Sequence, residues 1–265
     1  MRNNADRKDR FRDRREETRE EAPEGQLEGR NALTEALRSG RTIDKVFIAA
    51  GDTDKGLQRL AAQAKEAGAV VVPVDRRKLD QMSVTHAHQG VITLAAAKDY
   101  ATLDDILENA AQKGEAPLIV ICDELTDPHN LGAIIRSAEC VGAHGVIVPE
   151  RRSVGLTPAA VKASAGAVEH MKVARVVNLS RTIEDLKARN IWTYALDMDG
   201  VDYEKVNFKG GVALVVGSEG EGVSRLVVEH CDQKVSLPMA GHIDSLNASV
   251  AAGIMMYRVL SSRKA

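Results

Sequence analysis

The stretch Ala213-Leu214-Val215-Val216-Gly217-Ser218-Glu219-Gly220-Glu221-Gly222 places an apolar run directly before a glycine-rich turn. Four other largely apolar runs, at residues 118–121, 146–148, 174–177 and 192–196, alternate with helical patterns in the same half of the chain. Strands of this kind are typical of a parallel sheet that helices cover on both faces. We therefore expect an α/β fold, and we expect its ligand-binding residues in the loops that follow the strands.

The pattern along the chain predicts four segments. Residues 1–25 hold eight basic and eight acidic side chains and almost nothing apolar, which predicts a disordered charged tail. Residues 26–97 alternate short helices and strands and are expected to form a small α/β domain. Residues 98–116 are interpreted as a linker, and residues 117–265 as the larger α/β domain, with a last strand at 235–237 and a helix from about 246 to 260.

Composition limits the classes of protein that this chain can represent. The 265 residues are 44% hydrophobic and 28% charged, which excludes collagen-like and wholly disordered proteins. Three distant cysteines without a C-x-x-C spacing fit a reducing cytoplasm, and no apolar run is long enough to span a membrane. The net charge of -2 taken alone argues mildly against nucleic acid. His86 and His88 lack further ligands at a suitable spacing, so no metal site is expected.

The first unusual loop follows the run at 118–121 and leads into an apolar helix. Asn130 is a suitable N-cap for that helix, and Arg136 follows six residues later between Ile135 and Ala138. One interpretation is a capped helix with a solvated arginine. The other is a functional arginine, because a cation on so apolar a helix needs a partner.

The second loop is the glycine-rich turn at 217–222, whose glycines allow backbone N–H groups to approach a ligand closely. It lacks the lysine of a phosphate-binding P-loop, and Arg225 stands where the dinucleotide fingerprint requires glycine. Two carboxylates within the turn, Glu219 and Glu221, would repel a phosphate, so a cationic or neutral ligand suits it better. A tight strand-to-helix turn without a ligand is the alternative.

The third loop, residues 237–247, joins the last short strand to the last helix. Pro238 and Gly241 make the loop conformationally specific, and Ser245 or Asp244 could cap the helix that follows.

Taken together, these loops resemble the signature motifs of the SpoU branch of the SPOUT RNA methyltransferases. The resemblance covers residues 117–262, and residues 29–96 are similar to the RNA-binding substrate domain that precedes the catalytic domain in large-subunit rRNA guanosine methyltransferases of this family. The motifs that carry it are Asn130-x-Gly132-x-x-x-Arg136, Val216-Gly217-Ser218-Glu219-Gly220-x-Gly222, and Leu237-Pro238-Met239 with Ser245-Leu246-Asn247-x-Ser249-Val250-Ala251.

The resemblance implies a homodimer, with a deep C-terminal trefoil knot in the parallel sheet and an active site near the subunit interface. It implies S-adenosylmethionine as methyl donor. Arg136 would be the central catalytic residue, either as a base next to an RNA phosphate or as a cation that stabilises the developing alkoxide. The other implied catalytic residues are Asn130, Glu219, Ser245 and Asn247, and the implied cofactor contacts are Gly217, Leu237, Leu246, Leu196, Ser218 and Gly222.

The expected reaction is 2′-O-methylation of a ribose, with a guanosine of large-subunit (23S) rRNA as substrate. Methylation of tRNA is the alternative within the enzyme class. A catalytically silent RNA-binding protein for ribosome assembly is the alternative outside it, although the intact Asn130, Arg136, Glu219 and Asn247 argue against a silent site.

Overall fold

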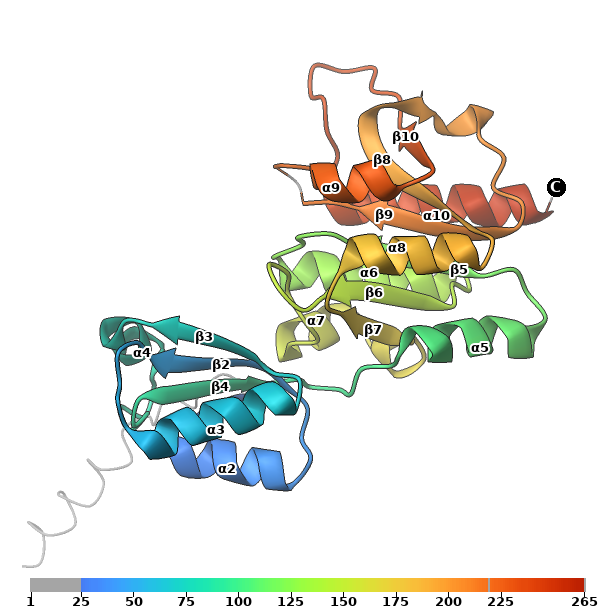
Figure 1. Ribbon diagram of the computed structural model, residues 1–265. Coiled ribbons are helices and arrows are strands. Elements are labelled where there is room, and N and C mark those ends of the chain that lie inside the picture. Colours follow the sequence, from blue (N-terminus) through green and yellow to red (C-terminus); the bar gives the residue numbers. More distant parts are fainter. Residues whose placement is uncertain (1–24, 219, 265) are drawn as a thin grey trace, which may run out of the picture. The chain divides into compact units, whose positions relative to one another are not determined.

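A computed structural model describes residues 25–218 and 220–264 of the chain (Figure 1). The described residues form two compact units. The first holds the residues up to Gly40 and Lys45–Leu94, and the second holds Arg41–Asp44 and all described residues from Ala95 onward. The charged tail expected at residues 1–25 lies almost wholly outside the described residues.

The first unit contains a four-stranded sheet in the order β1-β4-β2-β3. The strands are β1 (Gln26–Glu28), β2 (Ile43–Ala49), β3 (Val70–Val74) and β4 (Val91–Ala95), with β2 parallel to β3 and β1 antiparallel to β4. Its helices are α2 (Arg30–Arg38), α3 (Lys55–Glu66) and α4 (Arg76–Met82). Leu33, Leu57 and Leu79, one from each helix, are fully buried, so each helix contributes to the core of the unit.

The second unit contains a six-stranded sheet in the order β10-β8-β9-β5-β6-β7, and every pair of neighbouring strands is parallel. This confirms the parallel α/β fold predicted from the apolar runs. The strands are β5 (Leu118–Cys122), β6 (Gly145–Pro149), β7 (Val173–Val176), β8 (Ile191–Asp202), β9 (Gly211–Val216) and β10 (Gln233–Ser236).

Helices cover both faces of this sheet, because alternate side chains of each strand point to opposite sides. Val120 packs with the helices α6 (Pro128–Cys140), α7 (Pro158–Ala163) and α10 (Ala248–Lys264). Ile119 and Ile121 pack with α5 (Leu103–Lys113), α8 (Leu179–Ala188) and α9 (Arg225–His230) on the other face (Figure 1). Burial on both faces explains why the strands are so apolar.

Residues 98–116 are not an independent linker, because most of them form α5 of the second unit. Ile106 of α5 is fully buried, and a Cβ added to Gly145 would lie 2.4 Å from its side chain. This close approach requires glycine at the start of β6. The sequence pattern, which indicated a connection between domains, did not reveal that this segment belongs to the core.

Two further elements differ from the sequence prediction. The strand β1 was not predicted, and β8 continues to Asp202 instead of ending at Leu196. Gly200 makes the extension possible, since a Cβ there would lie only 2.5 Å from the backbone nitrogen of Val235 in β10.

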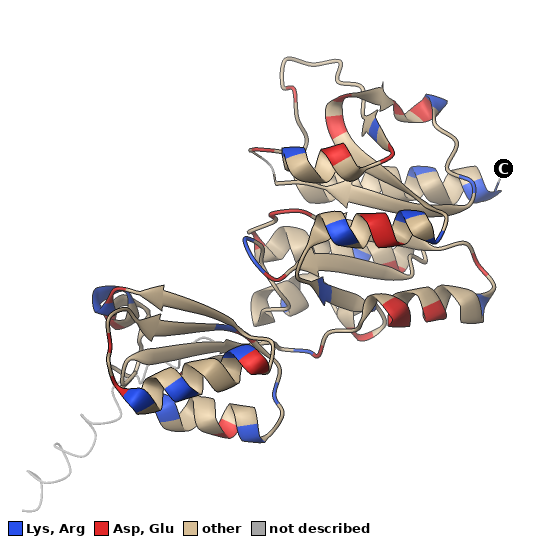
Figure 2. Cartoon of the chain, in the orientation of Figure 1, with Lys and Arg blue, Asp and Glu red and all other residues tan. Residues whose placement is uncertain are grey.

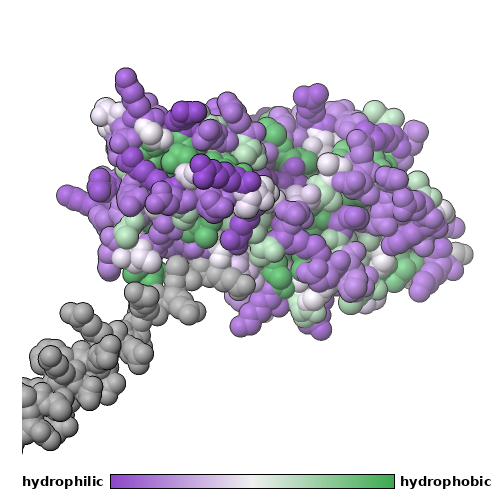
Figure 3. All heavy atoms as spheres, turned by 90° about the horizontal axis from the view of Figure 1, so that it is seen from below, coloured by the Kyte–Doolittle hydropathy of each residue, from purple (hydrophilic) through white to green (hydrophobic). Residues whose placement is uncertain are grey.

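The surface drawn in Figure 3 is mostly hydrophilic, with hydrophobic residues visible between the hydrophilic ones. In the described part of the chain, no helix is both long enough and apolar enough to cross a bilayer. Within residues 25–218 and 220–264, no three His, Cys, Asp or Glu side chains gather in a way that could hold a metal ion.

Candidate active site

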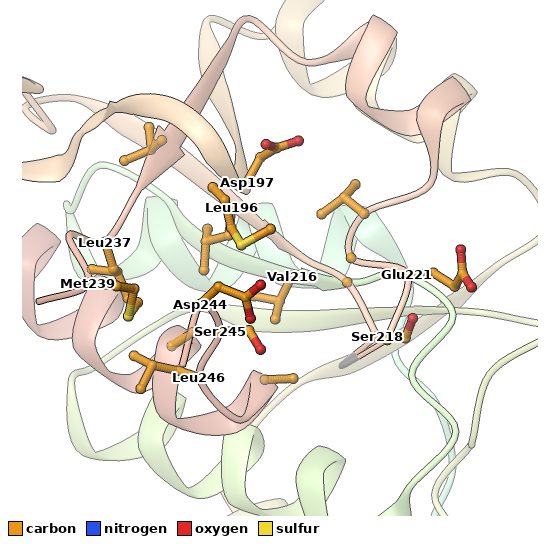
Figure 4. Close-up of a pocket in the computed structure, with 18 residues that line it drawn as sticks. Leu196, Asp197, Val216, Ser218, Glu221, Leu237, Met239, Asp244, Ser245 and Leu246 are labelled. Atoms are coloured by element: carbon orange, nitrogen blue, oxygen red, sulfur yellow. The ribbon is translucent and has the colours of Figure 1, made fainter. Parts of the chain in front are cut away.

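A pocket of about 340 Å³ lies at the carboxyl ends of β9 and β10, beside the middle of the longer strand β8, at the edge where a parallel sheet collects its ligand-binding loops. Its lining comes from these three strands, from the turn after β9, from the loop at 237–247 and from the first turn of α10 (Figure 4). The lining includes all six residues predicted to contact a cofactor: Leu196, Gly217, Ser218, Gly222, Leu237 and Leu246.

The glycine-rich turn after β9 is closed by its own backbone. Ser218 and Gly222 exchange two hydrogen bonds, with N···O distances of 3.1 and 2.9 Å. Gly217 lies so close to the returning chain that a Cβ would stand 1.9 Å from the carbonyl carbon of Gly222. Gly222 adopts a φ of 69°, a conformation that favours glycine. The turn therefore needs both glycines, one for space and one for its backbone conformation.

A buried carboxylate fixes the far end of this turn. Asp123, which follows β5 and is 3% exposed, accepts a hydrogen bond of 2.7 Å from the backbone nitrogen of Ser224. Its own backbone nitrogen donates to the carbonyl of Val216. Asp123 was not among the predicted site residues, although its position directly after an apolar strand was a usable signal.

The pocket combines apolar walls with carboxylates. Leu196, Leu237 and Leu246 supply apolar surface, and Asp244 lies among the labelled side chains at the centre of Figure 4. Asp197 also lines the pocket and forms a 2.9 Å ion pair with Lys234. Partial burial raises the pKa of Asp197, but the hydrogen bond and charge of Lys234 and the hydrogen bond from the backbone nitrogen of Asp199 together outweigh burial and lower the pKa below its usual value.

Two of the predicted catalytic residues meet across a long separation in sequence. The Nδ2 of Asn247 donates a 2.9 Å hydrogen bond to Oδ1 of Asn130. The Oδ1 of Asn247 accepts from the backbone nitrogens of Ser249 and Val250, so Asn247 caps α10. This side chain therefore joins the end of the loop at 237–247 to α6.

The predicted helix caps were wrong. Asn247 caps α10 in place of Ser245 or Asp244, because it stands directly before the first helical residue. Asp127 caps α6 by accepting from the backbone nitrogen of His129, and Asn130 lies within the first turn, 6% exposed. Pro128 at the first helical position was the signal for this boundary.

Arg136 is exposed on α6 and does not line the pocket. Within the described residues, its side chain has no hydrogen bond or ion pair, so the partner expected from its apolar surroundings does not lie in this part of the chain. Ser245 is exposed at the pocket. Glu219 lies outside the described residues.

Comparison with known proteins identifies the family. Residues 117–257 match the model of the SpoU rRNA methylase family, and residues 26–101 match the model named RNA 2′-O ribose methyltransferase substrate binding. The chain belongs to the SpoU methylase family.

Individual relatives agree with this assignment. The Bacillus subtilis (strain 168) protein YacO, named for the TrmH family of tRNA/rRNA methyltransferases, is 49% identical over 89% of this chain and 94% of its own. The SpoU methyltransferase AviRb of Streptomyces viridochromogenes, crystallised with AdoMet, is 26% identical with a TM-score of 0.57, over 89% of both chains. The TrmH/SpoU tRNA modifying enzyme of A. aeolicus is 28% identical with a TM-score of 0.51, over 57% of this chain and 77% of its own.

This SpoU methylase is an S-adenosylmethionine-dependent RNA methyltransferase. Its pocket fits that cofactor, which carries a flat base, a cationic sulfonium and an ammonium group. The leucines suit the base, the exposed carboxylates suit the cationic groups, and Gly217 leaves a backbone cradle that any side chain would fill. When bound, the cofactor supplies the methyl group.

Proposed function

We propose that this SpoU methylase methylates the ribose 2′-oxygen of a guanosine in large-subunit (23S) rRNA. The observation that carries the proposal is the combination, in one chain, of the glycine-cradled pocket and a unit that matches the substrate-binding model over residues 26–101. The A. aeolicus tRNA modifying enzyme matches only 57% of this chain. This partial match favours rRNA over the alternative, tRNA.

A ribose hydroxyl is a poor nucleophile, so the protein must stabilise the negative charge that develops on its oxygen. We assign this role to Arg136, because an arginine guanidinium is a cation with five N–H donors. Activation of Arg136 as a base by an RNA phosphate is the alternative. Asn130, Ser245, Asn247 and Glu219 are proposed to position the arginine and the substrate.

Arg136 and the exposed face of α10 support a homodimer. Val250, Ile254 and Tyr257 are 49%, 40% and 54% exposed, and their spacing places them on one face of α10. Helices α6 and α10 pack together, and a Cβ added to Gly253 would lie 3.8 Å from Oγ of Ser137, the residue after Arg136. A second copy that covers this apolar face would also cover Arg136 and bring it to a shared active site.

Ribose-methylation mapping of total RNA from cells with and without the gene tests the substrate. Loss of one guanosine mark in large-subunit rRNA is the expected result. Loss of a mark in tRNA would instead make tRNA the substrate. An unchanged map, together with no binding of S-adenosylmethionine, would favour the silent RNA-binding protein.

The role of Arg136 is tested by the pH–rate profile of Arg136→Lys. We expect the rate to fall by about 100-fold or more, because lysine offers a point charge instead of a planar fork of donors. A wild-type rate would refute a specific need for the guanidinium.

A further inference from the structure

A second concave surface lies in the first unit, between α2 and α3. It is a groove of about 640 Å³, and its lining includes three arginines, Arg30, Arg38 and Arg59, with no acidic side chain. Thr34 and Gln63 add polar atoms, and leucines from both helices complete the walls. Figure 2 shows the basic positions along both helices. Basic side chains from both α2 and α3 therefore line the same groove.

Two of these arginines are not engaged elsewhere. Arg38 and Arg59 are exposed, and neither side chain forms an ion pair or hydrogen bond within the described residues. Some exposed arginines of the second unit are engaged by carboxylates, since Arg152 pairs with Glu124 and Arg225 with Glu229. The groove thus keeps two guanidinium groups available for an external anion.

The third arginine helps to hold the end of the groove. Arg30 forms a 2.9 Å ion pair with Asp54, and its Nε donates a 3.3 Å hydrogen bond to the carbonyl of Gln89. Asp54 in turn caps α3 by accepting from the backbone nitrogen of Leu57. Arg30 therefore ties the start of α2 to the start of α3, and Arg38 and Arg59 carry the charge that is free to bind.

We infer that this groove holds the phosphate backbone of the RNA substrate, an inference that rests on the proposed function. Arginine forms two parallel hydrogen bonds to a phosphate, and uncommitted arginines gain more from such a ligand than arginines already paired. From Arg30 to Arg38, α2 rises about 12 Å, at 1.5 Å per residue. Successive nucleotides of a stacked strand are about 3.4 Å apart, so this length of helix can contact about three consecutive phosphates.

The other basic cluster of this unit, Arg76-Arg77-Lys78, provides a matched control. It occupies the first turn of the short helix α4, next to Asp75, and Leu79 of α4 packs with Val74 and Ile92. Figure 1 shows α4 apart from α2 and α3. None of its three basic residues lines the groove. Contacts that depend only on net charge would be weakened equally by neutralising either cluster.

The test compares the full-length double variants Arg38→Gln/Arg59→Gln and Arg76→Gln/Arg77→Gln, which remove the same number of charges. The RNA is large-subunit rRNA purified from cells that lack the gene, and affinity is measured by filter binding over a range of salt concentrations. For the groove variant we expect at least tenfold weaker binding. We also expect the slope of log association constant against log salt concentration to be shallower by about 1.5, because each lost phosphate contact reduces the slope by about 0.7–0.9. For the control we expect a change within about twofold.

The inference is overturned if both variants lose affinity equally, or if the groove variant binds rRNA as the wild type does. All four substituted side chains are exposed, so we expect both variants to fold, and S-adenosylmethionine binding and thermal unfolding serve as controls for folding. Failure of the wild type to methylate this rRNA would refute the proposed substrate. The comparison of the two variants in RNA binding would still decide whether the groove is the contact.

Discussion

The substitution Gly217→Ala tests whether the cofactor pocket depends on the closed glycine turn. The added Cβ would stand 1.9, 2.0 and 2.2 Å from backbone atoms of Gly222 and Val223. Ordinary van der Waals contact begins at 3.4 Å, so the turn would have to open by about 1.5 Å. Backbone atoms cannot rotate away as a flexible side chain can, so both hydrogen bonds between Ser218 and Gly222 would break.

The expected loss follows from these two hydrogen bonds, at about 1 kcal/mol each. A cost of about 2 kcal/mol corresponds to about a 30-fold increase in the Kd for S-adenosylmethionine, which isothermal titration calorimetry measures directly. Gly220→Ala is the matched control, because its Cβ meets nothing within 4 Å in the same turn. Equal affinities for the two variants, with thermal unfolding unchanged, would refute the reasoning.

Three further predictions test other parts of the structure. Asn247→Ala removes the cap of α10 and the hydrogen bond to α6, so we expect chemical denaturation to show a loss of about 2 kcal/mol, and an unchanged stability would contradict it. Gly132→Ala brings a Cβ within 2.5 Å of the carbonyl oxygen of Ala160 and should cost about 1–3 kcal/mol in thermal unfolding, whereas Gly253→Ala, with its nearest atom at 3.8 Å, should cost nothing. Burial raises the pKa of Glu28, but hydrogen bonds from three side chains and one backbone nitrogen outweigh it and lower the pKa to about 2. Its contribution to stability is therefore complete above pH 4.5 and is lost as the pH falls toward 2, and denaturation curves of Glu28→Gln over this range should show a smaller decrease than those of the wild type.

The parallel sheet could be predicted because its strands are buried on both faces and their apolar runs are continuous. At the edges of the sheets the strands are less buried, so they lack such apolar runs and are harder to predict. β1 has only three residues, all half-buried, and leaves no apolar run to recognise. The extension of β8 beyond Leu196 carries exposed and acidic residues, and only its pairing with β10 makes it a strand.

The loops of the site could be located because they follow strands, but their internal contacts could not. The partnership of Asn130 with Asn247 depends on the packing of α6 against α10, which no local pattern encodes. Pro128 could have predicted that Asp127, and not Asn130, caps α6, because proline favours the first position of a helix. The roles of the predicted cofactor contacts and catalytic residues, and the trefoil knot, stay predictions.

The hydrogen bond between Asn130 and Asn247 also sets an order of events during translation, because 117 residues separate its two partners. At about 5–20 residues per second, residue 247 is made roughly 6–23 seconds after residue 130. During this interval α6 has no α10 to cover it, and the pocket lacks the wall formed by residues 237–251. Cofactor binding can therefore stabilise the completed domain, but it cannot assist the folding of the nascent chain.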